Sequence, residues 1–346
     1  MTVGGGRYDV AFDARPAYDF LLSLAVDDDL SELPAEDQAW LRDARASLPA
    51  DVRAGMFVGK EQHHGLASEV AAVIVERPDV RSARALVTAI EAMSPVEICR
   101  PLLGCELGEG YEELVERVIA GDDAAAADAE ERLVAEAGEK HRATITAVLR
   151  DPLGTTERLH LALRAWLPLF QPIEDRISRA LDRDVVGRRA AAERLAPADL
   201  IEAATGGIRM MASAELRRVI LAPSYFARPF NYMFAAPGWR LFCYPLADDA
   251  LGEVDPHQPP LATIRLYRAL GDESRLRILR LLSDHDMYLT ELAQALELSK
   301  PTVKHHLAQL RVAGLVTMTE EGALTYYSLR RPRLDEAGVE LHRYLG

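Results

Sequence analysis

The chain has 346 residues, 49% of them hydrophobic, and a formal net charge of −14. This length predicts two domains or more with ample buried cores, and the acidic balance excludes a protein that holds nucleic acid through bulk positive charge. No apolar run approaches the roughly eighteen residues of a membrane span, and the first residues do not form a signal peptide. Three cysteines predict no disulfide framework, so we expect a cytoplasmic protein without a membrane partner.

The N-terminal part is predicted to be mostly helical. Tyr8–Phe12 alternates between polar and apolar residues and predicts a short strand, whereas the pattern from Ala14 to about Arg218 is almost wholly helical. Prolines, among them Pro152 and Pro172, are expected to separate the helices because proline lacks the backbone N–H. The helices predicted from apolar spacing are Ser68–Glu76, Val80–Met93, Tyr111–Ala120, Ala124–Arg150, Thr156–Arg164 and Ile173–Asp182.

Residues 216–246 differ in character because they are rich in aromatic side chains. Val219–Leu221, Tyr232–Phe234 and Arg240–Tyr244 are predicted strands. The segment has two interpretations: a small sheet packed on helices, which is the more usual meaning of such a run, or a pocket for an apolar or aromatic effector. The side chains expected to line that pocket are Phe230, Tyr232, Trp239 and Phe242.

An acidic, proline-bearing stretch, Asp248–Pro260, predicts a linker between two domains. We therefore expect an acidic effector or oligomerisation domain over 1–255 and a second domain over 256–346. From Leu261 to the C-terminus there are twelve Lys and Arg against eleven Asp and Glu, a charge of +1, which leaves −15 for the remainder. The acidity thus lies outside the second domain.

Two helices joined by a tight turn are predicted in this domain, over Glu291–Leu296 and Lys300–Ala313. Ser299 is a good N-cap, and Pro301 falls in the first turn, where its missing N–H costs nothing. Val303, Leu307 and Leu310 form one apolar stripe on the second helix. The other face carries Thr302, His305, His306 and Gln309 and is flanked by Lys300 and Lys304. Polar and basic side chains massed on the first half of a capped helix are typical of a helix that reads the major groove, although an ordinary surface hairpin shares the pattern.

The flanking residues complete a predicted winged helix. Helices are expected over Leu261–Ala269, Glu273–Leu282, capped by Asp272, and Leu334–Leu345. In the second of these, Leu276, Ile278, Leu279, Leu281 and Leu282 are the expected core residues. Leu315–Thr319 and Leu324–Leu329 are β-prone runs around Glu320-Glu321-Gly322, which predicts a hairpin and wing. The fold class is therefore mainly α: a helical N-terminal domain with a small β element, then a winged helix-turn-helix.

The segments ALGDESRLRILRLL, LTELAQALELSKPTVKHHLAQLRVAGLV and TYYSL, within Leu261–Gly346, resemble the ArsR (SmtB-like) family of bacterial winged-helix regulators. The resemblance implies a homodimer paired through the first and last helices of the domain, double-stranded DNA as partner, and repression altered by an effector. It places the reading positions on Lys300, Thr302, Lys304 and His305, with Gln309 and Arg311 nearer the DNA backbone. Ser299, Arg330 and Arg331 complete the expected DNA-binding set.

The sequence departs from the family pattern at two places. The metal-sensing members carry a cysteine pair on the first helix of the helix-turn-helix, whereas Tyr288–Ala293 has no cysteine, so no metal site is expected there. Glu320 and Glu321 stand at the expected wing tip, where family members are usually basic. Because carboxylates repel phosphate, insertion of this wing into DNA is not expected. Arg330, Arg331 and Arg333 follow and offer cations at the DNA backbone instead.

Other signals carry weaker interpretations. The adjacent His63 and His64 would point about 100° apart on a helix and would not chelate one metal. Cys99 and Cys105 are more often buried free thiols than a metal or redox site. Glu106–Gly110 resembles a methyltransferase nucleotide loop only faintly, and the strand–helix alternation that this chemistry needs is missing. No nucleophile-elbow, zinc-protease or phosphate-loop motif is present, so we expect no catalytic residues, no cofactor and no enzyme.

Together these patterns predict a homodimeric, sequence-specific transcriptional regulator, favoured as a repressor. Its N-terminal domain would either bind a small effector or mediate assembly. The alternative is an interaction module or enzyme whose winged helix does not bind DNA.

Overall fold

The computed structural model describes residues 2–3, 8–25, 33–50, 52, 65–94, 97–98, 112–137, 146, 149–210, 215–228, 230–236, 238–252, 259–321 and 324–346. The chain forms two compact units: Met1–Ala14 with Ala180–Gly346, and Arg15–Arg179. The expected domain boundary after residue 255 lies inside the first unit, so the independence of the two expected domains stays a prediction. The fold class is as predicted, mainly α with small sheets and a C-terminal winged helix.

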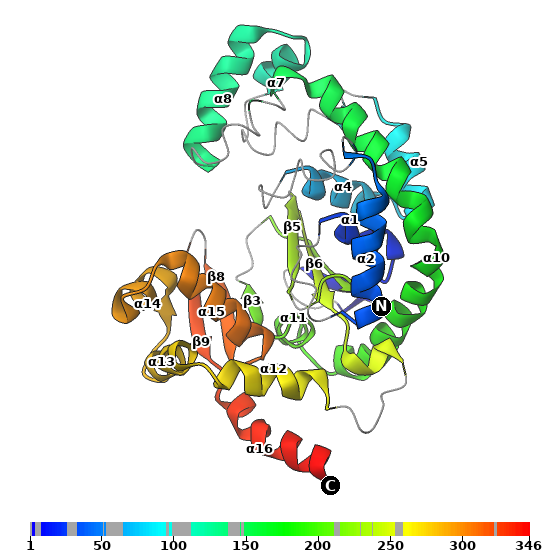
Figure 1. Cartoon of the computed structure of the whole chain (residues 1–346). Coiled ribbons are helices and arrows are strands. Elements are labelled where there is room, and N and C mark those ends of the chain that lie inside the picture. Colours follow the sequence, from blue (N-terminus) through cyan, green and yellow to red (C-terminus); the bar gives the residue numbers. More distant parts are fainter. Residues whose placement is uncertain are drawn as a thin grey trace. The chain divides into compact units, whose positions relative to one another are not determined.

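The unit Arg15–Arg179 is helical among its described residues (Figure 1). Its helices are α1 (Pro16–Ala25), α2 (Ala35–Ser47), α4 (Gly65–Glu76), α5 (Ala83–Glu91), α7 (Glu112–Ile119), α8 (Asp123–Ala137) and the first part of α10 (Pro152–Ala192). Ser82 caps α5 by accepting a hydrogen bond from the Ala85 N–H at 3.1 Å. Trp166 of α10 is fully buried, and its indole N–H donates to Ser23 at 2.8 Å, which satisfies the one polar atom of this large core side chain. His63, His64, Cys99, Cys105 and Glu106–Gly110 lie outside the described residues.

Helix α10 corrects the prediction that proline ends each helix. It runs unbroken for 41 residues through Pro168 and Pro172, so the two helices predicted on either side of these prolines are one. Pro152 stands at its first position, where a missing N–H is harmless, and the carboxylate of Asp151 accepts a hydrogen bond from the Gly154 N–H at 2.9 Å. An internal proline removes one hydrogen bond but does not end a helix when packing supports both sides.

A five-stranded sheet contains the aromatic segment. Its strands are β1 (Thr2–Val3), β2 (Asp9–Phe12), β4 (Arg218–Ser224), β5 (Tyr232–Ala236) and β6 (Trp239–Pro245), in the order β1-β2-β4-β6-β5. Strand β4 is parallel to both β2 and β6, and β5 is antiparallel to β6. One face packs on α11 (Pro197–Thr205), whose Leu200 and Ile201 share a core with Val219 and Leu221. The interpretation of this segment as a small sheet packed on helices is thus confirmed.

The pairing register corrects the expected effector lining. Tyr232 lies opposite Cys243 and Ala236 opposite Trp239, whereas Phe242 pairs with Met233 one residue along. Because side chains alternate between the faces of a strand, Tyr232 and Trp239 share one face and Phe242 lies on the other, in the core beneath α11. Phe230 is half-buried in the loop before β5. The four side chains do not line one cavity together, and binding of an aromatic effector by this segment stays a prediction.

A buried polar cluster joins α10 to the end of β6. The carboxylate of Asp184 is fully buried and accepts hydrogen bonds from the Tyr244 hydroxyl at 2.7 Å, the Ala247 N–H at 2.8 Å and the Arg188 Nε at 2.8 Å. The Arg188 guanidinium stacks over the Tyr244 ring at 4.7 Å. Burial, and next the charge of Asp184, raise the pKa of Tyr244 well above its usual range, so this hydroxyl remains a donor.

The winged helix has the predicted order of elements (Figure 1). These are α12 (Leu261–Leu270), α13 (Glu273–Leu282), β7 (Met287–Tyr288), α14 (Leu289–Leu296), α15 (Lys300–Val312), β8 (Val316–Glu321), β9 (Leu324–Leu329) and α16 (Arg331–Leu345). Asp272 caps α13 as predicted, accepting from the Arg275 N–H at 2.9 Å, and this hydrogen bond lowers the pKa of Asp272. Ile278, Leu279 and Leu282 are buried, but Leu276 is 49% exposed, so its assignment to the core was wrong.

Strand β3 (Ile208–Met210), which falls where the sequence predicted helix, joins the sheet of the wing. It pairs in parallel with β8, giving the order β3-β8-β9-β7 (Figure 1). Gly206 and Gly207 turn the chain from α11 into β3 with φ values of 69° and 119°. A Cβ at Gly207 would lie 3.3 Å from the Val316 carbonyl oxygen, and the Gly207 carbonyl accepts from the Met318 N–H at 2.9 Å. Glycine is therefore required here by both backbone angle and close approach.

The linker predicted over Asp248–Pro260 begins with ordered structure. Asp248 starts a 3-10 helix, η2 (Asp248–Leu251), and its carboxylate receives the guanidinium of the buried Arg228. The same carboxylate accepts from the Ala262 N–H at 3.1 Å, at the first turn of α12. Asp248 therefore fixes the start of the winged helix against the loop that follows β4.

Candidate nucleic-acid interface

The turn between α14 and α15 is set by local backbone contacts. The Glu291 carboxylate accepts from the Tyr288 N–H at 2.8 Å and holds the start of α14. At the other end of α14, Glu297 adopts φ 58°, a left-handed conformation, and the Leu298 N–H returns to the Ala293 carbonyl at 3.1 Å. This turn ends α14 within one residue and directs the chain into α15.

Helix α15 begins as the sequence predicts. Ser299 is its N-cap: its hydroxyl accepts from the Thr302 N–H at 3.3 Å and lies 2.8 Å from the Thr302 hydroxyl. Val303, Leu307 and Leu310 are buried in the core of the winged helix, which confirms the apolar stripe. That stripe fixes the rotation of α15, so its opposite face must point away from the core.

The outward face of α15 carries five of the nine expected DNA-contacting residues. Ser299, Lys300, Thr302, Lys304 and His305 are all exposed, and all belong to the N-cap or the first two turns. No acidic residue lies in the first turn. The N-terminus of a helix carries about half a positive charge and unpaired N–H groups, which favour phosphate. Lysines at this end add to that field, so the arrangement suits a phosphate contact beside a base-reading side chain.

Further along α15 the expected contacts become less available. Gln309 is half-buried, and the Nη1 atom of Arg311 is fully enclosed, so in this conformation Arg311 does not present its guanidinium to a DNA backbone. Its side chain instead lines a cavity with Arg188 and Arg265. His306, expected on the outward face, is half-buried with Nδ1 at 3.8 Å from the Asp272 carboxylate. On α15, the exposed part of the expected DNA-contacting set is therefore the first half of the helix, whereas Arg311 lines a cavity instead.

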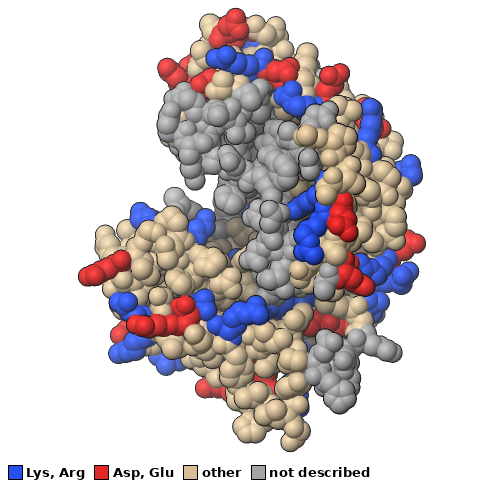
Figure 2. All heavy atoms as spheres, in the orientation of Figure 1, with Lys and Arg blue, Asp and Glu red and all other residues tan. Residues whose placement is uncertain are grey.

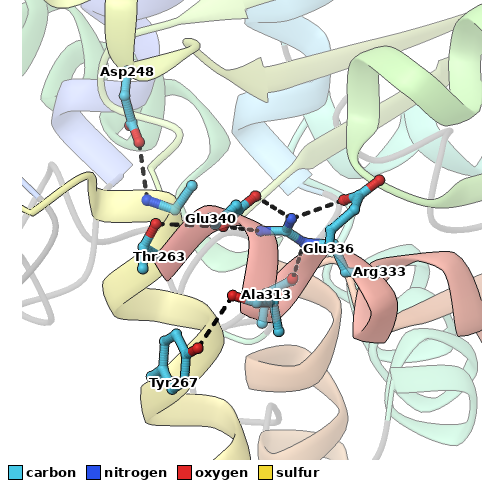
Figure 3. Close-up of polar contacts among 9 residues, drawn as sticks. Asp248, Thr263, Tyr267, Ala313, Arg333, Glu336 and Glu340 are labelled. Atoms are coloured by element: carbon cyan, nitrogen blue, oxygen red, sulfur yellow. Dashed lines mark hydrogen bonds and ion pairs between the residues drawn. The ribbon is translucent and has the colours of Figure 1, made fainter. Parts of the chain in front are cut away.

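The arginines after the wing have separate structural positions. Arg331 is exposed and donates to the Ser283 carbonyl at 2.8 Å, and Arg330 is half-buried just before α16. Arg333 is paired with Glu336 and Glu340 and donates to the Ala313 carbonyl at 3.2 Å (Figure 3). Arg333 thus connects α16 to the end of α15 and is not positioned for DNA. Residues 322 and 323 and the side chains of Glu320 and Glu321 lie outside the described residues, so the acidic wing tip stays a prediction.

The charge on the described surface is mixed. Figure 2 shows Lys and Arg interspersed with Asp and Glu over the winged-helix elements, as the near-neutral charge of this region predicts.

Among the described residues, no three His, Cys, Asp or Glu side chains are grouped closely enough to hold a metal ion. Within the same part of the chain, no helix has both the length and the apolar character needed to cross a membrane.

Known proteins are similar to this chain in its winged-helix segment. Residues 272–318, which run from the cap of α13 into β8, match the family model for bacterial regulatory proteins of the arsR family. The transcriptional activator HlyU of Vibrio cholerae is 37% identical over 78 residues, covering 22% of this chain and 72% of HlyU. The transcriptional repressor SdpR of Bacillus subtilis is 33% identical over 72 residues, covering 21% of this chain and 80% of SdpR. The chain belongs to the ArsR family.

The regulator KmtR of Mycobacterium tuberculosis is 29% identical over 85 residues, 25% of this chain, and the chain spans 65% of its length. Membership of the ArsR family makes this a protein with a transcription-regulating winged helix, as the sequence predicted. The relatives that share the matched segment include both a transcriptional activator and a transcriptional repressor.

Proposed function

We propose that this ArsR-family protein is a homodimeric, sequence-specific DNA-binding regulator that acts as a repressor and is controlled through its N-terminal part. The single observation that carries the proposal is the exposed first half of α15, where two lysines flank Thr302 and His305 on a capped helix N-terminus. In this arrangement Lys300 and Lys304 hold phosphate or guanine, and Thr302 and His305 read base edges. Ser299, Gln309, Arg330 and Arg331 contribute contacts at the margin.

Helices α12 and α16 offer a surface for the second copy. They pack together through the Tyr267 hydroxyl, which donates to the Ala337 carbonyl at 3.1 Å, and through Thr263 and Glu340 at 3.3 Å (Figure 3). Helix α16 has no buried residue in the single chain, and its apolar Val339 and Leu345 are 56% and 71% exposed. Apolar side chains left uncovered in one chain gain stability when a second copy covers them.

The experiment that tests the proposal is selection of bound duplexes from a random library with the full-length protein at moderate salt. A homodimer with one recognition helix per subunit should enrich an inverted repeat whose half-site centres lie about one helical turn apart, near 34 Å. Enrichment of unrepeated sites would contradict dimeric recognition. Absence of any enrichment by a folded, dimeric protein would contradict sequence-specific binding.

A dimer-surface variant tests the pairing separately. Replacing the exposed Val339 by Asp places a charge on the surface of α16. This change is expected to shift the protein towards monomer in sedimentation velocity. Operator affinity should then fall by at least about tenfold, because two half-sites are no longer bound together. Val186→Asp is the matched control, since Val186 on α10 is 62% exposed. Equal sedimentation of the two variants would exclude α16 from the dimer interface.

A further inference from the structure

A cavity of about 180 Å³ lies within the unit that contains the winged helix. Its wall includes the C-terminal turn of α11, the end of β6 and the loop residue before β5. Helix α12 and the last turn of α15 close the other side. It is smaller than the roughly 300–1,000 Å³ of drug-sized sites, so it suits a small metabolite.

Three guanidinium groups from three different helices converge on this cavity: Arg188 of α10, Arg265 of α12 and Arg311 of α15. None of the described lining residues is acidic. Arg188 is oriented by its hydrogen bond to Asp184 and its stacking on Tyr244, and Arg265 Nη2 lies 3.7 Å from the Asp248 carboxylate. Asp184 and Asp248 offset two of these charges but are not among the lining residues, so an anion in the cavity meets three arginines and no carboxylate. Guanidinium groups also match carboxylate and phosphate oxygens in paired hydrogen bonds.

The amide of Asn231 adds a different requirement. Its Nδ2 donates to the Thr205 carbonyl at 2.9 Å, which fixes the orientation of the amide. The Oδ1 atom is buried and has no hydrogen-bond partner among the described residues. A buried acceptor of this kind is costly until a donor reaches it. Because Oδ1 itself is closed off, a ligand that carries a hydroxyl or amino group beside its anionic group would supply that donor after a small rotation of the Asn231 side chain.

We propose that this cavity binds a small organic oxyanion, a carboxylate or phosphate with a neighbouring hydroxyl or amino donor, and that its occupancy changes DNA affinity. The second part rests on the proposed DNA-binding function. Arg311 and Val312, which line the cavity, form the end of the recognition helix α15. The opposite wall, Thr205 and Gly206, leads through Gly207 into β3 and so to wing strand β8. A ligand that contacts both walls binds more tightly when α15 and the wing hold one particular arrangement, which is the requirement for coupling.

Direct binding is tested by calorimetry and thermal shift on the full-length protein. The probes are glycerol 3-phosphate, glycerate and inorganic phosphate, against sodium chloride at matched ionic strength. We expect millimolar or tighter binding of at least one organic probe, and Arg265→Gln and Arg311→Gln should each weaken it by about tenfold or more. Comparison of glycerol 3-phosphate with glycerate distinguishes phosphate from carboxylate. Inorganic phosphate, which lacks a carbon-borne donor, is expected to bind more weakly than glycerol 3-phosphate.

Matched controls separate a specific site from a general effect of charge. Arg268→Gln removes an exposed arginine from the same helix, α12, and should leave binding unchanged. Arg265→Lys keeps the charge but loses the forked geometry, and an intermediate affinity is expected. Thermal unfolding without ligand shows which variants are folded. Equal binding by the wild type and both glutamine variants, or no binding of any probe by a folded wild type, would overturn the proposal.

The coupling is measured by repeating duplex binding with and without the bound probe. If the probe changes operator affinity in the wild type but not in Arg265→Gln, the result supports both anion binding in the cavity and its effect on DNA affinity. Probe binding that depends on Arg265 without any change in operator affinity keeps the anion site and overturns the coupling. If no operator can be selected at all, the DNA-binding function fails while the calorimetric result stands by itself.

Discussion

Replacing Lys300 and Lys304 together by alanine is expected to weaken binding to every duplex, whatever its sequence. Both side chains are exposed beside the positive end of α15, where they neutralise phosphates and release counterions. A bound homodimer loses four charge-assisted contacts, two from each subunit, which corresponds to an affinity loss on the order of ten-thousandfold. The slope of log affinity against log salt should fall in magnitude by about four, measured by fluorescence anisotropy over a salt series.

His305→Ala is expected to act differently, because we propose that this side chain reads bases. Its cost of about 1–3 kcal/mol per half-site should appear on the selected operator and hardly at all on random DNA, with an unchanged salt slope. Arg189→Ala removes an exposed cation on α10 and serves as the control for net charge. If His305→Ala lowered the affinities for operator and random DNA in the same proportion, α15 would not read bases through His305.

Removing the Asp184 carboxylate should cost about 3–5 kcal/mol of unfolding free energy, the usual loss when one partner of a buried ion pair is deleted. Asp184 is fully buried and accepts from Tyr244, Ala247 and Arg188, so Asp184→Ala leaves three donors without their acceptor. Burial alone would lower the pKa of Arg188, but Tyr244 and Asp184 together raise it. Arg188 is therefore charged in the wild-type protein.

Urea denaturation followed by circular dichroism measures this loss. Asp182→Ala removes an exposed carboxylate from the same helix and should change stability by no more than about 0.5 kcal/mol. Comparable midpoints for the two variants would show that the Asp184 cluster does not stabilise the junction of α10 with β6. Asp184→Asn, which keeps the shape and one acceptor oxygen, is expected to lie between them.

The winged helix could be predicted closely because its signals are local. Ser299 and Asp272 cap helices that begin at the next residue, and Val303, Leu307 and Leu310 lie at helical spacing on one buried stripe. These signals need no knowledge of distant residues. The exposed face of α15, which we propose reads DNA, is then the face opposite this buried stripe.

Features that depend on distant contacts could not be predicted in this way. Three residues, Ile208–Met210, carry no period of their own and become strand β3 only through pairing with β8. Phe242 was expected to share a cavity with Tyr232, and only the strand register places it on the opposite face. Arg188, Arg265 and Arg311 are far apart in sequence and carry no common motif, so their convergence appears only in the fold.

The pairing of β3 with β8 has a consequence for the order in which the protein matures during synthesis. Ile208 leaves the ribosome about 110 residues before its partner Met318, so β3 waits with an open edge while the intervening chain is made. A polypeptide arrested before β8 would keep that edge uncovered and be prone to self-association or degradation. The nascent chain would acquire its completed wing only near the end of translation, which delays DNA competence until almost the whole protein exists.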